Sequence, residues 1–454
     1  MKLELCFALL GTTSMACSWT RYDDVVEDSP IVLLNRPKQL EGGFGASLAT
    51  GTLEGEPILL VGGSPLTTGG VEFELGTGQS PTLDANDTGH CMGGEAPCFF
   101  TDTPVALTGA ASPGERRELC FVNGAGNAAS DVGLVVRCTD DVEYTLDMPQ
   151  DPADLLRLSL EVSQATLFSF GADYGVDPGL LATAQEERSV WYYPPLKRSF
   201  VDVPYPADAD GKWPEPELER DGTITNARKL NIARVDDVAR LLAVSVPDQA
   251  EIRLFYAPES TSPAYVGCLG GTPGFGRAMT TGPVLKNSDP DALVVADDSV
   301  VYVFDSAKLA TLPPALDGGC SLGALPEGAL IASFGCGSTK NISGCPSSGF
   351  GAALGVGDLD GDGDGEVIVG APSMTVRHVS NAGALILYDV EEPGDFSFMD
   401  IAFLASAETD DRLGSSIALP DLGNRRLLAA GAPGTGKVAL FYCLPNGLDG
   451  SRCN

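Results

Sequence analysis

The chain has 454 residues and a net charge of −34, from 28 Lys plus Arg against 62 Asp plus Glu. The electrostatic field of so acidic a chain repels phosphate backbones and anionic headgroups, which argues against nucleic acid as a partner. The 55 Gly, the 32 Pro and many short β-branched or aromatic runs between turn residues predict an all-β fold.

Residues 1–17 have the layout of an export signal. Lys2 precedes a short apolar run, which is too short to span a bilayer, and small residues then lead to Cys17. The stretch Ser14-Met15-Ala16-Cys17 resembles a bacterial lipobox, with Ser14 where Leu is usual. We expect an outer-membrane or cell-surface lipoprotein whose lipid on Cys17 is its only membrane contact. Cleavage without lipidation stays open and would give a periplasmic or secreted protein.

The body of the protein is predicted over residues 31–443, after a linker at residues 18–30. Residues 31–34 form an apolar run that is suited to serve as the outer strand of the last repeat and so remove an exposed edge. Residues 444–454 are expected to be a tail, tied back by a bond between Cys443 and Cys453.

A two-strand phrase recurs seven times in this body. Its equivalent positions lie 60, 61, 61, 51, 74 and 61 residues apart, and each unit has room for about four short strands. One such unit cannot bury both faces alone, so the repeat predicts a seven-bladed β-propeller. Near-continuous apolar runs such as 366–370 and 427–430 are predicted to be the inner strands. The equivalent positions are Leu59, Leu119, Leu180, Leu241, Ala292, Glu366 and Leu427.

Ten cysteines remain when Cys6 and Cys17 are set aside, and they fall as neighbours along the chain. Local disulfides that staple loops and hairpins in an oxidising compartment fit this pattern. Zinc is the alternative, although there is no CxxC spacing and the chain has only 2 His. The expected pairs are Cys91 with Cys98, Cys120 with Cys138, Cys268 with Cys320, Cys336 with Cys345, and Cys443 with Cys453.

The sixth unit carries three short motifs in a fixed order. They are Gly349-Phe350-Gly351, an acidic loop over residues 358–366, and Gly370-Ala371-Pro372. The unit resembles the FG-GAP repeats of integrin α subunits and related bacterial surface proteins. That resemblance implies a seven-bladed propeller with Ca²⁺ loops on one face and ligand loops commonly on the other. Other units keep fragments of the pattern, at Gly43-Phe44-Gly45, Gly274-Phe275-Gly276 and Leu413-Gly414.

The acidic loop has the donors that Ca²⁺ requires, because this hard cation takes six to eight oxygens. Asp358, Asp360 and Asp362 occupy positions 1, 3 and 5. The Asp364 carbonyl supplies position 7 and Glu366 supplies position 9. Without Glu at position 12 the loop is not an EF-hand. A solvated acidic turn is the alternative, but repulsion among the carboxylates favours a structural Ca²⁺ site.

The sequence favours a binding protein over an enzyme. Loops at about 76–114, 194–225 and 305–348 are long enough to carry recognition. Neither His90 nor His378 lies near a nucleophile motif, and both are expected to be solvated loop residues. We therefore expect a monomeric, non-catalytic, Ca²⁺-stabilised scaffold that binds a protein or glycan ligand at the cell envelope. The alternative is a Ca²⁺-dependent polysaccharide hydrolase or lyase that uses the propeller channel mouth.

Residues 431–437 match the GxxxxGK spacing of a P-loop. Val438 stands where Ser or Thr would bind Mg²⁺, and the residues that follow are typical of a strand, not of the helix that would bind phosphate. This segment is therefore expected to be a turn without a nucleotide.

Overall fold

The computed structural model describes a set of ranges between residues 31 and 441. These ranges are 31–36, 43–53, 56–62, 70–75, 106–109, 118–123, 134–138, 143–146, 168–172, 180–184, 190–193, 201–205, 213, 229–236, 239–246, 249–258, 262–285, 291–312, 320–322, 325–336, 349–359, 363–420 and 427–441. The expected signal at 1–17, the linker at 18–30, the lipidated Cys17 and the tail at 444–454 lie outside them.

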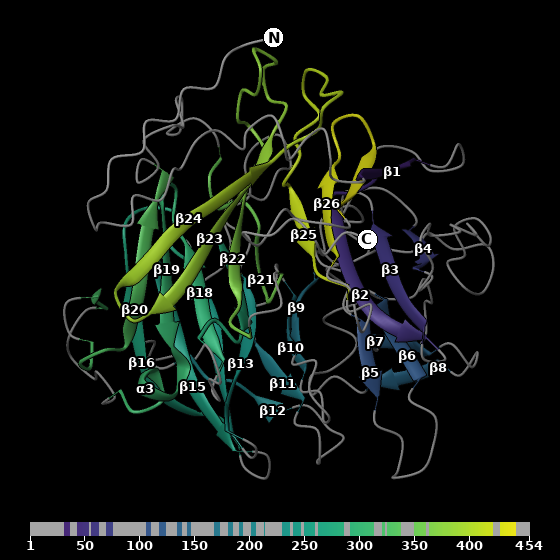
Figure 1. The fold of residues 1–454 in the computed structure, drawn as a ribbon. Coiled ribbons are helices and arrows are strands. Elements are labelled where there is room, and N and C mark those ends of the chain that lie inside the picture. Colours follow the sequence, from purple (N-terminus) through teal and green to yellow (C-terminus); the bar gives the residue numbers. More distant parts are fainter. Residues whose placement is uncertain are drawn as a thin grey trace, which may run out of the picture.

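Within these ranges the strands pair into seven antiparallel sheets, numbered 1 to 7 here in chain order (Figure 1). Sheet 1 contains β2 (Ser47–Leu53), β3 (Glu56–Gly62) and β4 (Gly70–Glu74). Sheet 2 contains β5 (Ala106–Gly109), β6 (Glu118–Asn123), β7 (Leu134–Cys138) and β8 (Glu143–Leu146). Sheet 3 contains β9 (Phe168–Ala172), β10 (Leu180–Ala184), β11 (Trp191–Tyr193) and β12 (Val201–Asp202).

The other sheets follow the same plan. Sheet 4 contains β13 (Leu230–Asp236), β14 (Ala239–Val246), β15 (Glu251–Pro258) and β16 (Ala264–Gly270). Sheet 5 contains β17 (Ala278–Gly282), β18 (Ala292–Ala296), β19 (Val300–Asp305) and β20 (Leu330–Gly335), and the short helix α3 (Ser306–Leu309) follows β19. Sheet 6 contains β21 (Leu354–Gly357), β22 (Glu366–Ala371), β23 (Ala384–Glu392) and β24 (Asp395–Ala402). Sheet 7 contains β25 (Ser416–Ala418), β26 (Leu428–Ala432), β27 (Lys437–Phe441) and β1 (Ile31–Asn35).

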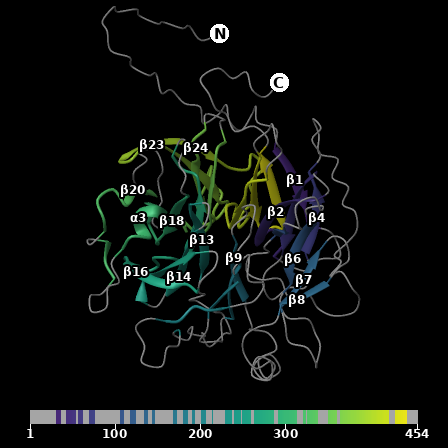
Figure 2. The same ribbon diagram turned by 90° about the horizontal axis from the view of Figure 1, so that it is seen from below.

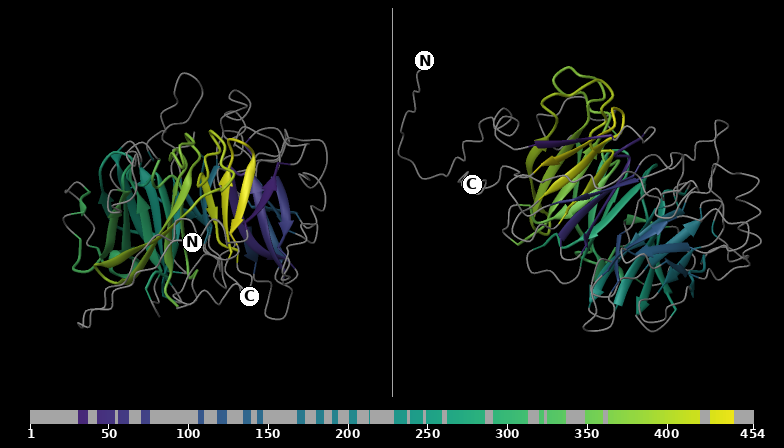
Figure 3. Two further views of the ribbon diagram at one scale, coloured as in Figure 1. Left: turned by 45° about the horizontal axis from the view of Figure 1, so that its top comes forward. Right: turned by 90° about the vertical axis from the view of Figure 1, so that its right-hand side faces the viewer.

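The sheets follow one another in chain order around the molecule (Figure 2). From sheet 3 to sheet 7, the first strands of neighbouring sheets contact one another: β9 contacts β13, β13 contacts β17, β17 contacts β21, and β21 contacts β25. Beyond β25 the chain of contacts returns to the N-terminal sheets, because β25 contacts β2 and β2 contacts β5. The yellow C-terminal strands accordingly lie beside the purple N-terminal strands (Figure 3).

Strand β1 closes sheet 7 from the opposite end of the chain. It pairs antiparallel with β27, with Leu33 opposite Ala439. The prediction that residues 31–34 form the outer strand of the last unit is therefore confirmed. A separate contact joins sheet 7 to the turn before sheet 1, since the Ser416 hydroxyl donates a 2.7 Å hydrogen bond to the carbonyl of Gly45.

The second strand of each well-described sheet is buried along its whole length, as in β14, β18, β22 and β26. Their near-continuous apolar sequences fit strands that are covered on both faces. The prediction that the runs in β22 and β26 are inner strands covered on both faces agrees with this burial, although each is the second strand of its sheet and not the first. The strands that meet their counterparts in neighbouring sheets are the smaller first strands, such as LGVG in β21 and SIA in β25.

A Phe-Gly turn precedes the first strand in four sheets and has the same hydrogen bond each time. The glycine adopts a left-handed φ, which L side chains rarely adopt, and its N–H donates to a carbonyl at the end of the second strand. The buried residue before that glycine is Phe44, Phe275, Phe350 or, in sheet 7, Leu413. The bonds are Gly45 to Gly62, Gly276 to Ala296, Gly351 to Gly370 and Gly414 to Gly431, at 2.9 to 3.0 Å.

One predicted disulfide is confirmed directly. Cys268 in β16 is bonded to Cys320, with their Cα atoms 5.2 Å apart, so the bond joins sheet 4 to the segment before β20 of sheet 5. Cys336 is also disulfide-bonded, and its expected partner Cys345 lies outside the described residues.

The structure describes the backbone of one further expected pair and leaves the others outside its ranges. Cys120 and Cys138 stand opposite each other in the β6–β7 ladder, as their predicted pairing requires of the backbone. Cys91, Cys98, Cys443 and Cys453 lie outside the described ranges. None of the helices in these ranges has the length and apolar character needed to cross a membrane.

Candidate metal centre

The connection between β21 and β22 brings an acidic segment against sheet 5. The N–H of Gly365 donates a 3.1 Å hydrogen bond to the carbonyl of Val284. A Cβ at Gly365 would lie 2.0 Å from the carbonyl oxygen of Pro283, so only glycine fits this approach. Earlier in the loop, the N–H of Leu359 donates to Glu366 Oε2. The loop is therefore held both by the preceding sheet and by one of its own carboxylates.

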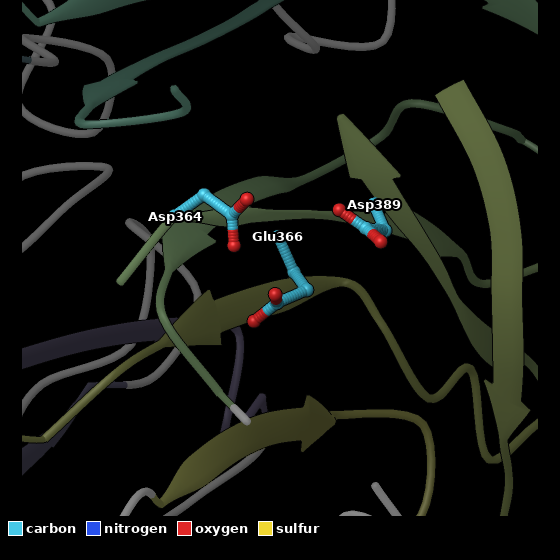
Figure 4. A group of neighbouring side chains, drawn as sticks. All are labelled: Asp364, Glu366 and Asp389. Atoms are coloured by element: carbon cyan, nitrogen blue, oxygen red, sulfur yellow. The ribbon is translucent and has the colours of Figure 1, made fainter. Parts of the chain in front are cut away.

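Three carboxylates converge where this loop enters β22. Asp364, Glu366 and Asp389 each offer an oxygen within 4.8 Å of the others (Figure 4). Asp364 lies in the bend just before β22, and Glu366 is the first residue of that strand. The β22–β23 register pairs Val367 with Tyr388, which places Glu366 opposite Asp389 one step along the hairpin.

The burial of this group is unusual for acidic residues. Glu366 is 1% exposed and Asp364 is 7% exposed, while Asp389 is half-buried. The positions equivalent to Glu366 in other units hold apolar residues with exposures of 0 to 3%, namely Leu59, Leu241, Ala292 and Leu427. Sheet 6 therefore has a carboxylate at a position that is otherwise part of the apolar core.

A cation resolves the energetic problem that this group poses. Carboxylates that lie this close together repel one another, and like charges opposite each other on a sheet are destabilising. Oxygen donors of this kind are those that hard divalent cations prefer. The acidic cluster could thus hold a metal ion, and Ca²⁺ would draw its remaining oxygens from the loop backbone, other loop side chains or water.

The same segment carries the match to known proteins. Residues 350–388 match the family model of the FG-GAP repeat. The chain therefore contains an FG-GAP repeat. The matched segment begins at the Phe350 turn, includes the acidic loop and β22, and ends one residue before Asp389. No curated protein matches the chain.

Within and beside this FG-GAP repeat the structure brings together two of the five expected ligands. Asp364 and Glu366 belong to the cluster, whereas Asp358 is half-buried and is not a member of it. Asp360 and Asp362 lie outside the described residues, so their role as ligands stays a prediction. The expected contribution of Asp364 was its carbonyl, whereas the cluster presents its carboxylate.

Asp389 was missed from the sequence. It comes directly after the apolar run of residues 384–388, where it resembles an ordinary strand-end acid. Only the hairpin register identifies it as the neighbour of Glu366. A count back along β23 from the Val367–Tyr388 pair was the signal available.

The P-loop-like segment is a turn between β26 and β27, as expected, and β27 begins at Lys437. The Lys437 ammonium lies 2.6 Å from Glu408 Oε1 and 3.3 Å from Oδ1 of Asp411, which is fully buried. Burial by itself lowers the pKa of Lys437, but its hydrogen bonds and the two negative charges outweigh that effect and raise the pKa. This lysine therefore ties the turn to the preceding loop.

Two members of the aromatic group of sheet 3 are core residues. Tyr192 is fully buried and Trp213 is 1% exposed, and the indole N–H of Trp213 donates to the Val203 carbonyl at 2.7 Å. Both side chains therefore belong to the packed core.

Proposed function

We propose that this FG-GAP repeat protein is a non-catalytic, seven-bladed β-propeller that binds a protein or glycan ligand at the cell envelope, with Ca²⁺ bound in its sixth blade. The observation that carries the ring is the series of first-strand contacts, which runs from β9 through β25 to β2 and β5. Pairing of β1 with β27 supports closure of the ring in the seventh sheet.

The calcium part of the proposal rests on the cluster of Asp364, Glu366 and Asp389. The cluster spans the β22–β23 hairpin, so a bound cation would cross-link two strands and the preceding loop. A ligand that binds only the folded state stabilises it by RT ln(1 + [L]/Kd), or about 4 kcal/mol at 1,000 times Kd. A structural role for Ca²⁺ follows from this position.

Buried polar groups elsewhere support a scaffold role. Asp297 is 1% exposed and accepts hydrogen bonds from the N–H groups of Ser299 and Val300 and from the hydroxyls of Thr272 and Tyr302. These bonds hold the β18–β19 turn. Such groups are engaged in holding turns and hairpins, which is what a rigid binding platform requires.

A second buried network, around Arg253, fits the same role. Its guanidinium bonds Glu251 at 2.6 Å and Tyr205 at 3.2 Å, and it lies 5.2 Å from the centre of the Tyr205 ring. The contacts link strand β15 to the segment that ends sheet 3. They therefore fasten two sheets together.

An envelope location is supported by the cysteines and by the N-terminal pattern. The bond between Cys268 and Cys320 fits an oxidising compartment. Lipid on Cys17 is proposed as the anchor, and Cys17→Ala would remove labelling by radioactive palmitate if that is correct. Labelling that survives the substitution would reject the lipid anchor.

The experiment that tests the proposed function is a glycan and protein array probed with the purified protein, in Ca²⁺ and in EDTA. We expect a ligand to be retained in Ca²⁺ without being consumed, and binding to fall in EDTA as the sixth sheet loosens. Polysaccharides are also incubated with the protein and assayed for new reducing or unsaturated ends. Release of such ends in Ca²⁺ would instead establish the alternative, a polysaccharide hydrolase or lyase.

A further inference from the structure

Two loops at one end of sheets 6 and 7 hold a group of residues in left-handed backbone. The metal cluster lies at the start of β22, and the β22–β23 loop leaves the other end of that strand. Among the described residues six non-glycine residues have positive φ, and five of them lie in the β22–β23 and β24–β25 loops. The five are Arg377, His378, Asn381, Asp410 and Arg412, and the sixth is Ala250 in the β14–β15 turn.

Arg377 and His378 form the tip of a two-residue hairpin. Val376 and Val379 exchange both backbone hydrogen bonds, at 3.1 and 2.8 Å. Arg377 has φ 47° and His378 has φ 70°, which is the backbone of a type I′ turn. This turn strongly prefers Asn-Gly, because side chains with a bulky Cβ substituent are strained at positive φ. Replacing Arg377 with Asn and His378 with Gly would therefore give a turn with less backbone strain.

Arg412 is a third bulky residue at such a position. It stands two residues before Gly414, where the other Phe-Gly turns have Gly43, Gly274 and Gly349 at φ 68°, 84° and 67°. Arg412 has φ 60°. At the position of Arg412, the other three turns therefore have glycine, which adopts this backbone without strain.

The three bulky left-handed residues share one property, which is that all are basic and exposed. The whole chain of 454 residues has only 28 Lys plus Arg and 2 His, so this coincidence needs a cause. Asn381 and Asp410 need none, because Asn and Asp tolerate left-handed backbone. Backbone strain that persists at an exposed site is typical of a functional position.

The two loops are locked to each other, so the basic residues are presented on a rigid base. The N–H of Arg412 donates to the Asn381 carbonyl at 2.9 Å, and Asn381 Nδ2 donates to Asp410 Oδ1 at 2.7 Å. The Arg377 guanidinium lies 5.0 Å from the centre of the buried Phe403 ring. The backbone of Arg412 and the side chain of Arg377 are thus held in place before a ligand binds, which favours binding.

We propose that Arg377, His378 and Arg412 form a basic turn face that binds an acidic polysaccharide through its carboxylate or sulfate groups. Arginine forks match such anions geometrically. The exposed residues of the two loops include hydroxyls suited to sugar groups and no aromatic or large aliphatic side chain, unlike the core of a protein interface or a membrane-inserting surface. This inference rests on the proposed binding function and names its ligand class. The exposed hydroxyl residues are Thr375, Ser380, Ser406 and Thr409.

The acidic side chains beside this face have partners within the protein. Asp410 accepts the hydrogen bond from Asn381, and Glu408 is paired with Lys437. Remote negative charges of the chain are screened at physiological salt, where the Debye length is about 8 Å. The net charge of −34 therefore does not prevent local binding of an anionic chain.

The test compares binding and stability in the same variants. Binding to polygalacturonate, dextran sulfate and neutral dextran is measured by calorimetry in 150 mM salt, about the physiological value. We expect the wild type to bind polygalacturonate, dextran sulfate or both, and not dextran. The R377N/H378G double variant should bind at least about tenfold more weakly while its Tm rises by about 2 °C, since strain is relieved.

Two variants serve as matched controls. Ala250→Gly relieves the same kind of strain in a distant turn, so its Tm should rise without any loss of binding. Lys308→Asn removes an exposed cation from helix α3, so binding should change by less than about twofold if the basic turn face is the site.

Several results would overturn the proposal. They are unchanged binding by R377N/H378G, a lower Tm for that variant, equal affinity for dextran, no binding of either acidic chain by the wild type, or binding only to phosphatidylserine vesicles. A ligand from the array that still binds the double variant would reject this face and leave the proposed scaffold function standing.

Discussion

Replacing Glu366 with leucine tests whether the cluster of Asp364, Glu366 and Asp389 destabilises the protein in the absence of a cation. The substitution restores the residue type that other units have at this position. Carboxylate oxygens 4.8 Å apart repel by about 3 kcal/mol at an effective dielectric constant of about 20. Glu366 takes part in two such pairs, and its loss also removes the hydrogen bond from the Leu359 N–H, which is worth about 2 kcal/mol. Without a cation, Glu366→Leu should therefore raise the free energy of unfolding by about 4 kcal/mol.

Calcium should reverse this order. At 1,000 times Kd the wild type gains about 4 kcal/mol from the bound ion, whereas the variant has lost a ligand and gains much less. The assay is urea unfolding of both proteins in EDTA and in Ca²⁺. Glu366→Gln is the control, since it removes the charge and keeps an acceptor for Leu359. A Glu366→Leu protein that is less stable than the wild type by the same amount in both buffers would show that the carboxylates neither repel one another in EDTA nor bind Ca²⁺.

Three further substitutions test the packing. Gly351→Ala should lower the free energy of unfolding in urea by about 2 to 4 kcal/mol, because Gly351 has φ 80° and a Cβ would lie 2.6 Å from Ala296 Cβ. Gly394→Ala, at φ 87° with nothing within 4 Å of the added Cβ, should lower it by only about 1 kcal/mol. Equal losses in the two variants would show that the contact with Ala296 does not matter. Tyr388→Phe should leave the protein equally stable or up to about 1 kcal/mol more stable. The reason is that burial raises the pKa of Tyr388 and that its hydroxyl has no hydrogen-bond partner among the described residues. A clear loss of stability in urea unfolding would count against this prediction. Lys437→Met should lower the stability of the protein at neutral pH. Because the folded pKa of Lys437 is raised, the difference in stability from wild type should be complete below the unfolded pKa of about 10.4 and disappear as the pH rises through the folded pKa. Thermal melts between pH 7 and 12 measure this difference, and a pH-independent difference would contradict the prediction.

Strands that are covered on both faces were visible in the sequence because burial imposes a continuous apolar run, as in β22 and β26. The first strands were not visible. LGVG and SIA are too short and too small to be distinguished from turns, and their composition reflects contacts with other sheets. A Cβ at Gly355 would lie 2.8 Å from Ile417 of the next first strand, and one at Gly282 would lie 2.8 Å from Val356. Such pairings join distant parts of the chain, so no local pattern predicts them.

The candidate site divides in the same way. The spacing of acids within one loop identified Asp364 and Glu366, because Ca²⁺ chemistry is local to a turn. Asp389 enters through cross-strand register, which depends on the length of an irregular hairpin loop. Arg377 and His378 gave no turn signal, because their left-handed backbone departs from the Asn-Gly preference that sequence reasoning relies on.

The most direct measurement is anomalous diffraction from crystals of the protein grown with Ca²⁺. We expect an anomalous peak within bonding distance of Asp364, Glu366 and Asp389, and no such peak in Glu366→Leu crystals. Ordered carboxylates with no peak between them would contradict the metal centre.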